Sequence, residues 1–333
     1  MIPPLPLVSL LALSPLPVVR EAFLMGTTLR AEVTGDRSVA TAAIQQAFDT
    51  VAALELVLST WREDSEIAAL NRARPGEAVP LSRELAGLLA EVEGWWRRTG
   101  GAFDPAVGPL VDAWDLRGKG RVPGGPSLAR ARSASGLEHF VFQHGDAGTT
   151  ARRGTPEGWL DTGGFGKGAA LRAAAAKLRV AGIASAALNF GGQVAFLGAG
   201  PERGSWLVPV AHPADRGRPV VALRVADASV STSAQSERYV SVNGTRYGHI
   251  LDPRTGRPVP RWGSVTVVNP DPLAADVLST ALFVLGPEAG SAYARQHGIA
   301  ALFLVQRGGE LQSIVTPALR PLLAGSPLPS LGG

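Results

Sequence analysis

The chain has 333 residues, of which 45% are hydrophobic and 18% charged, and this composition suits one large globular domain or two closely packed ones. It has no cysteine, so disulfides, thiolate zinc sites and cysteine nucleophiles are excluded. The formal charge of +4 comes with scattered arginines and no run of five basic residues, which argues against a nucleic-acid partner, although a basic field would favour an anionic ligand.

The first nineteen residues are apolar, carry no charged side chain and are interrupted by five prolines. The segment is too short and too interrupted for a clean membrane-spanning helix. A signal peptide without a basic start, a disordered leader and a wrongly assigned start codon all stay open. We therefore expect an apolar leader or signal segment over 1–20, one domain over 21–325 and a flexible tail over 326–333. An extracytoplasmic location, periplasmic or membrane-associated, is expected, and a cytoplasmic one stays open because the segment is atypical.

The first third of the chain is predicted to contain one strand and three helices. Hydrophobic periodicity predicts the strand over 23–33 and the first helix over 39–58. Asp64 and Ser65 are candidate caps for the second helix. Ser82 caps the third, which ends at Gly100 and Gly101.

Two segments rich in turn-forming residues, 117–126 and 145–158, are interpreted as surface loops that tolerate insertion. The rest mixes strands and helices without the alternation of a parallel sheet, and no internal repeat is visible. We therefore predict the α+β class, with a mainly antiparallel sheet system flanked by helices. Strands are predicted over 185–197, with a glycine pair inside it, 206–210, 220–225, 238–242, 264–268 and 300–305. Helices are predicted over 168–178, 274–285 and 288–297.

The segment 273–286, which reads LAADVLSTALFVLG, carries a possible metal site. Asp276 and Thr280 are four residues apart on the predicted helix and so project from the same face. A carboxylate and a hydroxyl suit a hard cation such as magnesium, which takes oxygen ligands and completes its shell with water and substrate phosphate. The alternative is that the helix dipole favours the Asp276 carboxylate and that Thr280 bonds back to its own helix. Both interpretations stay open at this point.

The segment 160–168, which reads LDTGGFGKG, has the outline of an anion-binding loop. Its glycines lead into an alanine-rich helix whose first turn would present backbone N–H groups to an anion. It is not a Walker loop, because Lys167 is followed by Gly168 in place of Ser or Thr. A glycine-rich turn that merely enters a helix is the alternative.

The segment 247–259, which reads YGHILDPRTGRPV, places His249 just before a strong turn signal. A neutral imidazole there could take the proton from an attacking hydroxyl near pH 7. A histidine with a purely structural role is the alternative.

Taken together, these segments resemble, in order and register, the FAD:protein FMN transferase family, also called ApbE. The resemblance covers nearly the whole chain, because it includes the segments MGT at 25–27, LSTWREDSEIAALN at 58–71 and GAFDPAVGPLVDAW at 101–114. It implies an ApbE-like, T-fold-related α+β fold with the FAD site in a cleft between two closely packed subdomains.

The resemblance also implies roles for individual residues. Asp276 and Thr280 match side-chain magnesium ligands, and Gly164 matches a position where a backbone carbonyl completes the metal site. Two departures from the family's pattern bear on local backbone geometry. Ala234 follows the Ser-Thr-Ser element at 231–233, where the family often has glycine. Position 164 carries glycine, where the family often has alanine, serine or threonine. The residues that match FAD-binding positions are Met25, Trp61, Ala102, Phe103, Asp104, Asp161, Lys167, Asn189, Gly191, Gly192, His249 and Ile250, with Phe190 beside the glycine pair.

The implied activity is magnesium-dependent transfer of FMN from FAD, as a substrate, to a Thr or Ser hydroxyl of an acceptor protein, with release of AMP. His249 and Asp276 are the expected catalytic residues, His249 by activating the acceptor hydroxyl. The expected partner is a flavoprotein with a Thr/Ser motif, and the family points toward membrane redox subunits. A magnesium-dependent FAD pyrophosphatase and a non-catalytic FAD-binding protein are the alternatives.

Overall fold

A central antiparallel sheet organises the computed structural model, which describes residues 16–146, 148–236 and 238–325. The sheet has eight strands in the order β1-β2-β6-β7-β10-β15-β16-β17, and each strand is antiparallel to its neighbours. This confirms the predicted α+β class. The strands are β1 (Val18–Leu24), β2 (Thr27–Thr34), β6 (Ser185–Phe190), β7 (Gln193–Leu197), β10 (Ser229–Ala234), β15 (Gly263–Asn269), β16 (Ala300–Arg307) and β17 (Glu310–Val315).

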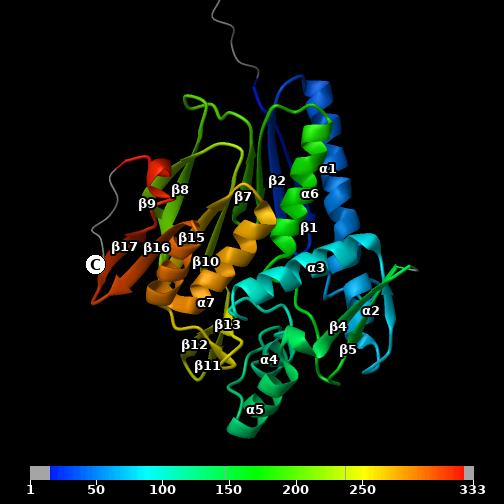
Figure 1. The fold of residues 1–333 in the computed structure, drawn as a ribbon. Helices are drawn as coiled ribbons and strands as arrows, with labels where there is room; N and C mark the ends of the chain where they lie inside the picture. The colour runs from blue at the N-terminus through cyan, green and yellow to red at the C-terminus, as the bar shows by residue number, and fades with distance from the viewer. Residues whose placement is uncertain (1–15, 147, 237, 326–333) are drawn as a thin grey trace, which may run out of the picture.

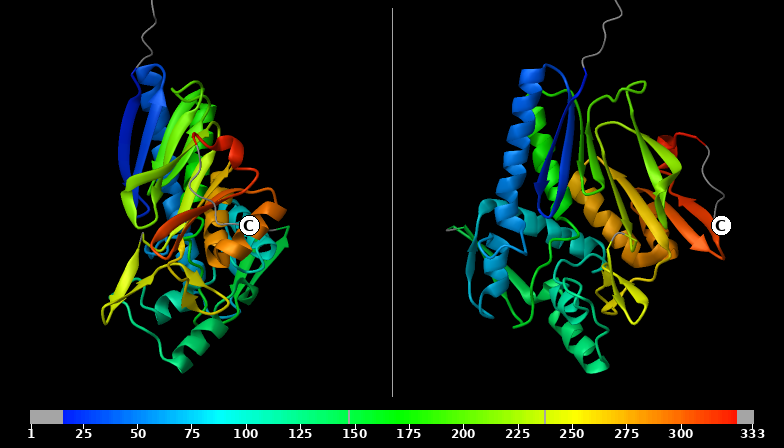
Figure 2. Two further views of the ribbon diagram at one scale, coloured as in Figure 1. Left: turned by 90° about the vertical axis from the view of Figure 1, so that its left-hand side faces the viewer. Right: turned by 180° about the vertical axis from the view of Figure 1, so that it is seen from behind.

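Three helices, α1 (Arg37–Leu58), α6 (Gly166–Val180) and α7 (Pro272–Gln296), cover one face of this sheet. Figures 1 and 2 show α1 and α6 side by side against the strands, and α7 lies against β10 and β15. α1 begins where the Asp36 side chain accepts hydrogen bonds from the first backbone N–H groups of the helix. Its apolar side chains then recur every three or four residues, so the helix buries one stripe in the main core.

The α7 helix is apolar and largely buried. Among the described residues it is the helix that is long and apolar enough to cross a membrane, yet 72% of that stretch is buried inside the protein. Gly286, with φ of 80°, and Pro287 interrupt it. The two helices predicted over 274–285 and 288–297 are therefore confirmed as the two halves of an interrupted α7.

The other face of the sheet is covered over part of its width by a long hairpin of β8 (Trp206–His212) and β9 (Asp215–Val225). Phe196, Val230 and Leu302 point to this side and form a second core with the hairpin. Side chains alternate between the two faces along each strand, so one sheet serves both cores. The hairpin confirms the predicted strands over 206–210 and 220–225.

The remaining elements form a smaller part below the main sheet in Figure 1. Ser65 and Ser82 cap their helices as predicted, by accepting hydrogen bonds from Ala68 and Leu85. The elements are α2 (Glu66–Arg72), α3 (Arg83–Arg98), α4 (Gly108–Ala113), α5 (Gly125–Ala134), the sheet of β3 (Val79–Leu81), β5 (Gly148–Arg153) and β4 (Phe140–Gly145), and the hairpins of β11 (Tyr239–Val242) with β12 (Thr245–Gly248) and β13 (Leu251–Asp252) with β14 (Arg257–Pro258).

Two of the predicted strands are hairpins. The strand predicted over 23–33 turns at Met25 and Gly26, which have φ of 47° and 77°. The strand predicted over 185–197 turns at Gly191 and Gly192, which have φ of 57° and 96°. Two successive residues with positive φ form the two-residue turn that matches the right-handed twist of paired strands. The prediction of one continuous strand was therefore wrong at each of these turns.

The two predicted surface loops are also partly wrong. Half of 145–158 is strand, because it contains the last residue of β4 and all of β5, which pairs with both β3 and β4 and buries only Ala151 among its residues. The segment 117–126 contains the first residues of α5, and Arg117 is anchored inside the protein. β1 begins at Val18, within the range given to the leader, whereas 1–15 and the tail lie outside the described residues. The division into leader, domain and tail stays a prediction.

Candidate active site

The glycine-rich segment and the helix of Asp276 meet at the centre of the molecule, where α6 and α7 both begin (Figure 1). A Cβ on Gly168 would lie 2.5 Å from the Pro272 carbonyl oxygen and 2.8 Å from the Asp276 Cβ, so only glycine allows this approach. The Gly168 N–H donates to Asp276 Oδ2 at 2.9 Å. This backbone group from the first turn of α6 is thus used to hold a carboxylate of the protein itself.

A methyl group at position 168 is therefore expected to be damaging. Gly168→Ala should lower the free energy of unfolding by about 1–3 kcal/mol, because α6 must move away from α7. Urea denaturation would measure the change. Gly87→Ala is the matched control, since a Cβ at this exposed position of α3 meets no atom within 4 Å. Equal effects of the two substitutions would contradict the packing argument.

The three predicted metal ligands lie next to one another. Asp276 is 4% exposed, and its Oδ1 is 3.5 Å from Lys167 Nζ. Thr280 Oγ1 donates to the Asp276 carbonyl at 3.1 Å, so the back-bonding alternative is also seen, although the hydroxyl oxygen keeps its lone pairs. A Cβ on Gly164 would lie 3.6 Å from Thr280 Cγ2, which places the backbone of Gly164 against the hydroxyl-bearing side chain.

This donor set fits a hard cation that needs few protein ligands. It offers one carboxylate, one hydroxyl and one backbone carbonyl, and such a set leaves positions for water and phosphate around magnesium. The described part of the chain contains no group of three or more His, Cys, Asp or Glu that could hold a metal. A site with a single acidic ligand is consistent with that finding. Magnesium ligation by Gly164, Asp276 and Thr280 stays a prediction.

A chain of buried hydroxyl groups supports the helix behind these ligands. Ser279 Oγ lies 3.0 Å from Ser231 Oγ, 2.9 Å from Ser233 Oγ and 3.0 Å from the carbonyl oxygen of Asp276. The Ser-Thr-Ser element on β10 is therefore linked to the backbone of the proposed metal ligand. Sequence reasoning singled out this element but did not identify Ser279 as its partner.

The charges of Lys167 and Asp161 both act on the pKa of His249. Its Nδ1 is 3.1 Å from the carbonyl oxygen of Arg238. A carbonyl only accepts, so Nδ1 carries the proton and Nε2 keeps its lone pair. Burial, followed by the positive charges of Arg238 and Lys167, lowers the pKa of His249 to about 4. The imidazole is therefore neutral at pH 7, in the tautomer that a general base at Nε2 requires.

Gln235, which sequence reasoning missed, holds the loop that carries His249. Its side-chain amide donates to the carbonyl oxygens of Ile250 and Val259 at 2.6 and 3.0 Å and accepts from the Ile250 N–H at 3.1 Å. Gln235 is 2% exposed, so these bonds are shielded from water. The polar residue after the Ser-Thr-Ser element was visible in the sequence, but its partners were not.

Met25 lies beside the start of α6, and the glycine pair of β6–β7 lies against the β1–β2 hairpin. The Met25 Cε atom is 3.5 Å from the position of a Cβ on Gly166. Gly191 lies against Thr27, because a Cβ there would be 3.0 Å from the threonine side chain. The turns of β1–β2 and β6–β7 are therefore adjacent, and Gly192 comes next in the second turn.

The segment 102–104 packs against the glycine-rich segment 160–168 through Phe103. Ala102 and Phe103 are buried, and Phe103 packs edge-on against Phe165 with ring centroids 6.5 Å apart. The Asp104 carboxylate accepts hydrogen bonds from the backbone N–H groups of Ala106 and Leu137, and burial raises its pKa to about 6. The structure thus gives these side chains packing and loop-holding roles, and their FAD contacts stay a prediction.

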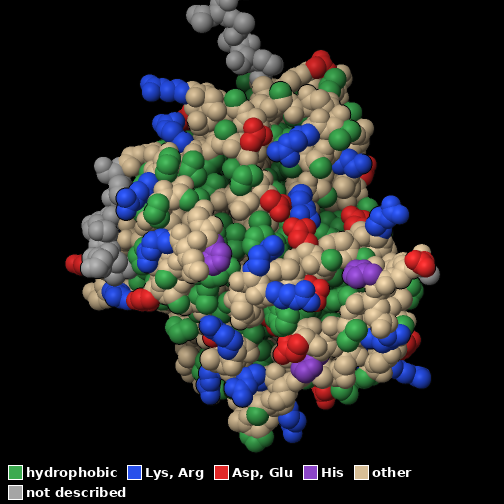
Figure 3. All heavy atoms as spheres, viewed as in Figure 1, with side chains coloured by type: hydrophobic (Ala, Val, Ile, Leu, Met, Phe, Trp, Pro, Cys, Tyr) green, Lys and Arg blue, Asp and Glu red, His purple; other side chains and the backbone are tan. Residues whose placement is uncertain are grey.

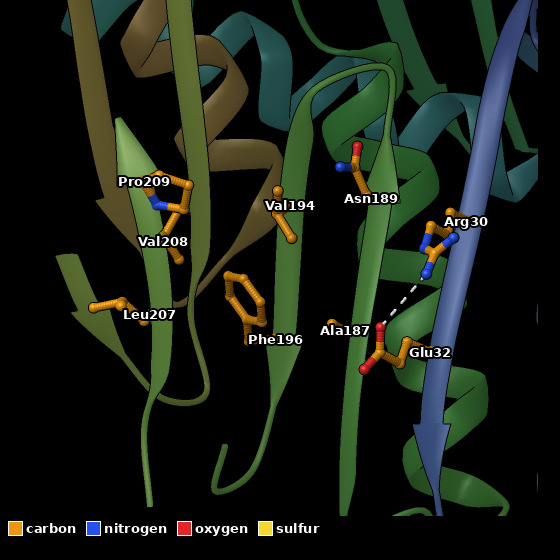
Figure 4. Close-up of a pocket in the computed structure, with 9 residues that line it drawn as sticks. All are labelled: Arg30, Glu32, Ala187, Asn189, Val194, Phe196, Leu207, Val208 and Pro209. Atoms are coloured by element: carbon orange, nitrogen blue, oxygen red, sulfur yellow. Dashed lines mark ion pairs between the residues drawn. The ribbon is translucent and has the colours of Figure 1, made fainter. Parts of the chain in front are cut away.

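The Asn189 side chain lies on the face of the sheet opposite the main core. In β6 its neighbour Phe190 points into the main core, so the Asn189 side chain points to the opposite face of the sheet. There it lines a hollow of about 220 Å³ with Arg30 and Glu32, as Figure 4 shows. Its Oδ1 accepts a hydrogen bond from the Gly192 N–H at 3.1 Å, which stabilises the β6–β7 turn.

Trp61 and Asp161 are joined by Arg117, a third residue that sequence reasoning missed. Its guanidinium carbon lies 4.5 Å from the centre of the Trp61 ring, and its NH2 group is 2.9 Å from Asp161 Oδ2. In the space-filling view, Lys and Arg side chains are spread over the visible face with Asp and Glu among them (Figure 3). Arg117 is distinguished by a side chain that is only 26% exposed and is paired with Asp161.

The fold and the candidate site define the class of protein: an α+β protein built on an eight-stranded antiparallel sheet, with a buried carboxylate next to a lysine where α6 and α7 begin. The sequence model of the ApbE family matches residues 25–303, and the chain belongs to this family.

Relatives and solved structures agree with this assignment. The chain is 30% identical over 307 residues to "FAD:protein FMN transferase" of Klebsiella pneumoniae (strain 342), covering 90% of this chain and 88% of that protein. It is 32% identical over 302 residues to the protein of the same name from Treponema pallidum (strain Nichols), covering 86% and 83%. The fold is similar to "Flavin Transferase ApbE from Vibrio cholerae", with a TM-score of 0.82, 28% identity and coverage of 92% and 99%.

Proposed function

We propose that this protein is an FAD:protein FMN transferase that moves the FMN half of FAD, in the presence of magnesium, to a Thr or Ser hydroxyl of an acceptor protein and releases AMP. The observation that carries the proposal is the adjacency of Gly164 to Thr280 and of Asp276 to Lys167, in a chain of the ApbE family that also carries a histidine with a lowered pKa, His249. The names of the curated relatives support the reaction class.

In this proposal the residues of the chain have separate tasks. Gly164, Asp276 and Thr280 would hold magnesium, which would neutralise charge on the pyrophosphate. Lys167, at the start of α6, adds a positive charge beside that position. His249 Nε2 takes the proton from the acceptor hydroxyl, whose oxygen forms the new bond to the FMN phosphorus. The bond between that phosphorus and the bridging oxygen breaks, and AMP leaves with that oxygen.

The acceptor and the location are further parts of the proposal. A membrane redox subunit that carries a Thr or Ser acceptor motif is the proposed partner. An extracytoplasmic location, periplasmic or membrane-associated, is proposed because the chain begins with an apolar segment.

The test is to incubate the purified protein with FAD and magnesium, with and without a candidate acceptor encoded beside it. We expect AMP release together with a covalent mass increment of FMN on the acceptor, and loss of both on chelation of the metal. AMP without the increment would indicate a pyrophosphatase, and intact FAD would leave a binding protein. Either of these two outcomes would overturn the proposal.

A further inference from the structure

The guanidinium group of Arg117 lies over two indole rings. Its central carbon lies 4.5 Å from the ring centre of Trp61 and 4.3 Å from that of Trp159. A cation above an aromatic ring is attracted by the negative face of the ring. Trp159 is itself held, because its Nε1 donates to Asp112 Oδ2 at 2.7 Å. Arg117 therefore contacts one ring that is held in place, Trp159, and a second ring, Trp61.

The nitrogen atoms of Arg117 bind two further segments. NH2 lies 2.9 Å from Asp161 Oδ2 and 2.7 Å from Thr60 Oγ1, and NH1 lies 3.0 Å from the Thr60 carbonyl oxygen. The side chains of Arg117 and Asp161 are only 26% and 21% exposed. This shielding makes the ion pair stronger than one at an open surface.

Arg117 thereby connects the loop that precedes α2 to the glycine-rich segment. Asp161 uses its other oxygen, Oδ1, to accept the Gly163 N–H at 2.6 Å, and Gly164 follows directly. Trp61 is 72% exposed although Arg117 lies over its ring. Arg117 thus fixes the position of the exposed Trp61 ring relative to the partly buried Asp161 carboxylate.

We infer that Arg117 is a positioning residue for FAD, which holds the Trp61 indole and the Asp161 carboxylate in the arrangement that receives the flavin nucleotide. The inference rests on the proposed function in taking FAD as the ligand, but it concerns binding and requires no transfer. Arg117 is assigned no contact with the reacting atoms. Its loss should therefore weaken FAD binding while leaving the chemical step largely intact.

The test compares Arg117→Ala and Arg117→Lys with the wild type by titrating FAD, without magnesium or acceptor, against tryptophan fluorescence. Removal of the ion pair and of the stacking should raise the Kd for FAD about tenfold to a hundredfold. Lysine keeps the charge but lacks the planar fork, so Arg117→Lys should still raise the Kd about tenfold. In transfer assays, the KM for FAD should rise while kcat changes less than about threefold.

Arg121→Ala is the matched control. Arg121 lies in the same loop and donates to the carbonyl oxygens of Ala113 and Asp112, with none of the predicted FAD-binding residues among those partners. It should bind FAD with the wild-type Kd. Wild-type affinity in Arg117→Lys, or an equal loss in Arg121→Ala, would overturn the inference. Weakened FAD binding in the Arg117 variants, with no FMN transfer by the wild type, would instead refute the proposed function and leave this inference standing.

Discussion

Replacement of Asp276 by asparagine is expected to lower the rate of FMN transfer about a thousandfold. The reason is that a bound metal ion stabilises the negative charge on the phosphates of the transition state by several kcal/mol. Asparagine has the size of aspartate, and its amide oxygen can still accept the hydrogen bond from the Gly168 N–H. The charge that attracts the cation is lost. The measurements are the initial rate of AMP release at saturating FAD and the magnesium concentration that gives half of the maximal rate.

Asp271→Asn provides a control on the same helix. Asp271 caps the N-terminus of α7 through the Leu273 N–H, and asparagine caps helices equally well. This variant should fold and transfer FMN like the wild type. Full activity of Asp276→Asn at low magnesium would rule out Asp276 as a metal ligand and would favour the alternative in which it only joins α6 to α7.

Replacement of His249 by glutamine is expected to lower kcat about a hundredfold to ten-thousandfold, the range of a general base. Glutamine can still donate to the Arg238 carbonyl, so the loop should keep its shape, but no group remains to take the proton from the acceptor. FAD affinity should change far less than kcat. Single-turnover transfer to the acceptor would measure the chemical step, and an unchanged rate would show that His249 is a structural residue.

The pH dependence of the wild type follows from the same residue. Burial lowers the pKa of His249 to about 4, so the neutral form that acts as base predominates above that pH and is lost as the pH falls through it. The transfer rate should be level between about pH 6 and 8 and should fall toward pH 4. His249→Gln should lack this fall over the range in which it remains folded. A rate that rises from pH 6 to 8 with an apparent pKa near 7 would contradict the buried environment.

Much of the local structure was predictable from the sequence. The caps at Ser65 and Ser82, the break at Gly286 and the face shared by Asp276 and Thr280 all depend on interactions within a few residues. The same reasoning missed the turn at Met25, where a non-glycine residue adopts positive φ inside an apolar run. It also missed β5, whose polar composition reflects a strand that buries one residue.

The composition of the candidate site was predictable, but its assembly was not. The sequence by itself determined which residues can supply oxygen ligands, an imidazole base and a close backbone approach, because these properties belong to a side chain and its local backbone. Only the tertiary structure decided that Lys167 meets Asp276, 109 residues away, that Arg117 lies over two indole rings, and that the Asn189 side chain lines a hollow with Arg30 and Glu32. The physical reason is that such contacts depend on how strands pair and helices pack over long separations, which no local pattern specifies.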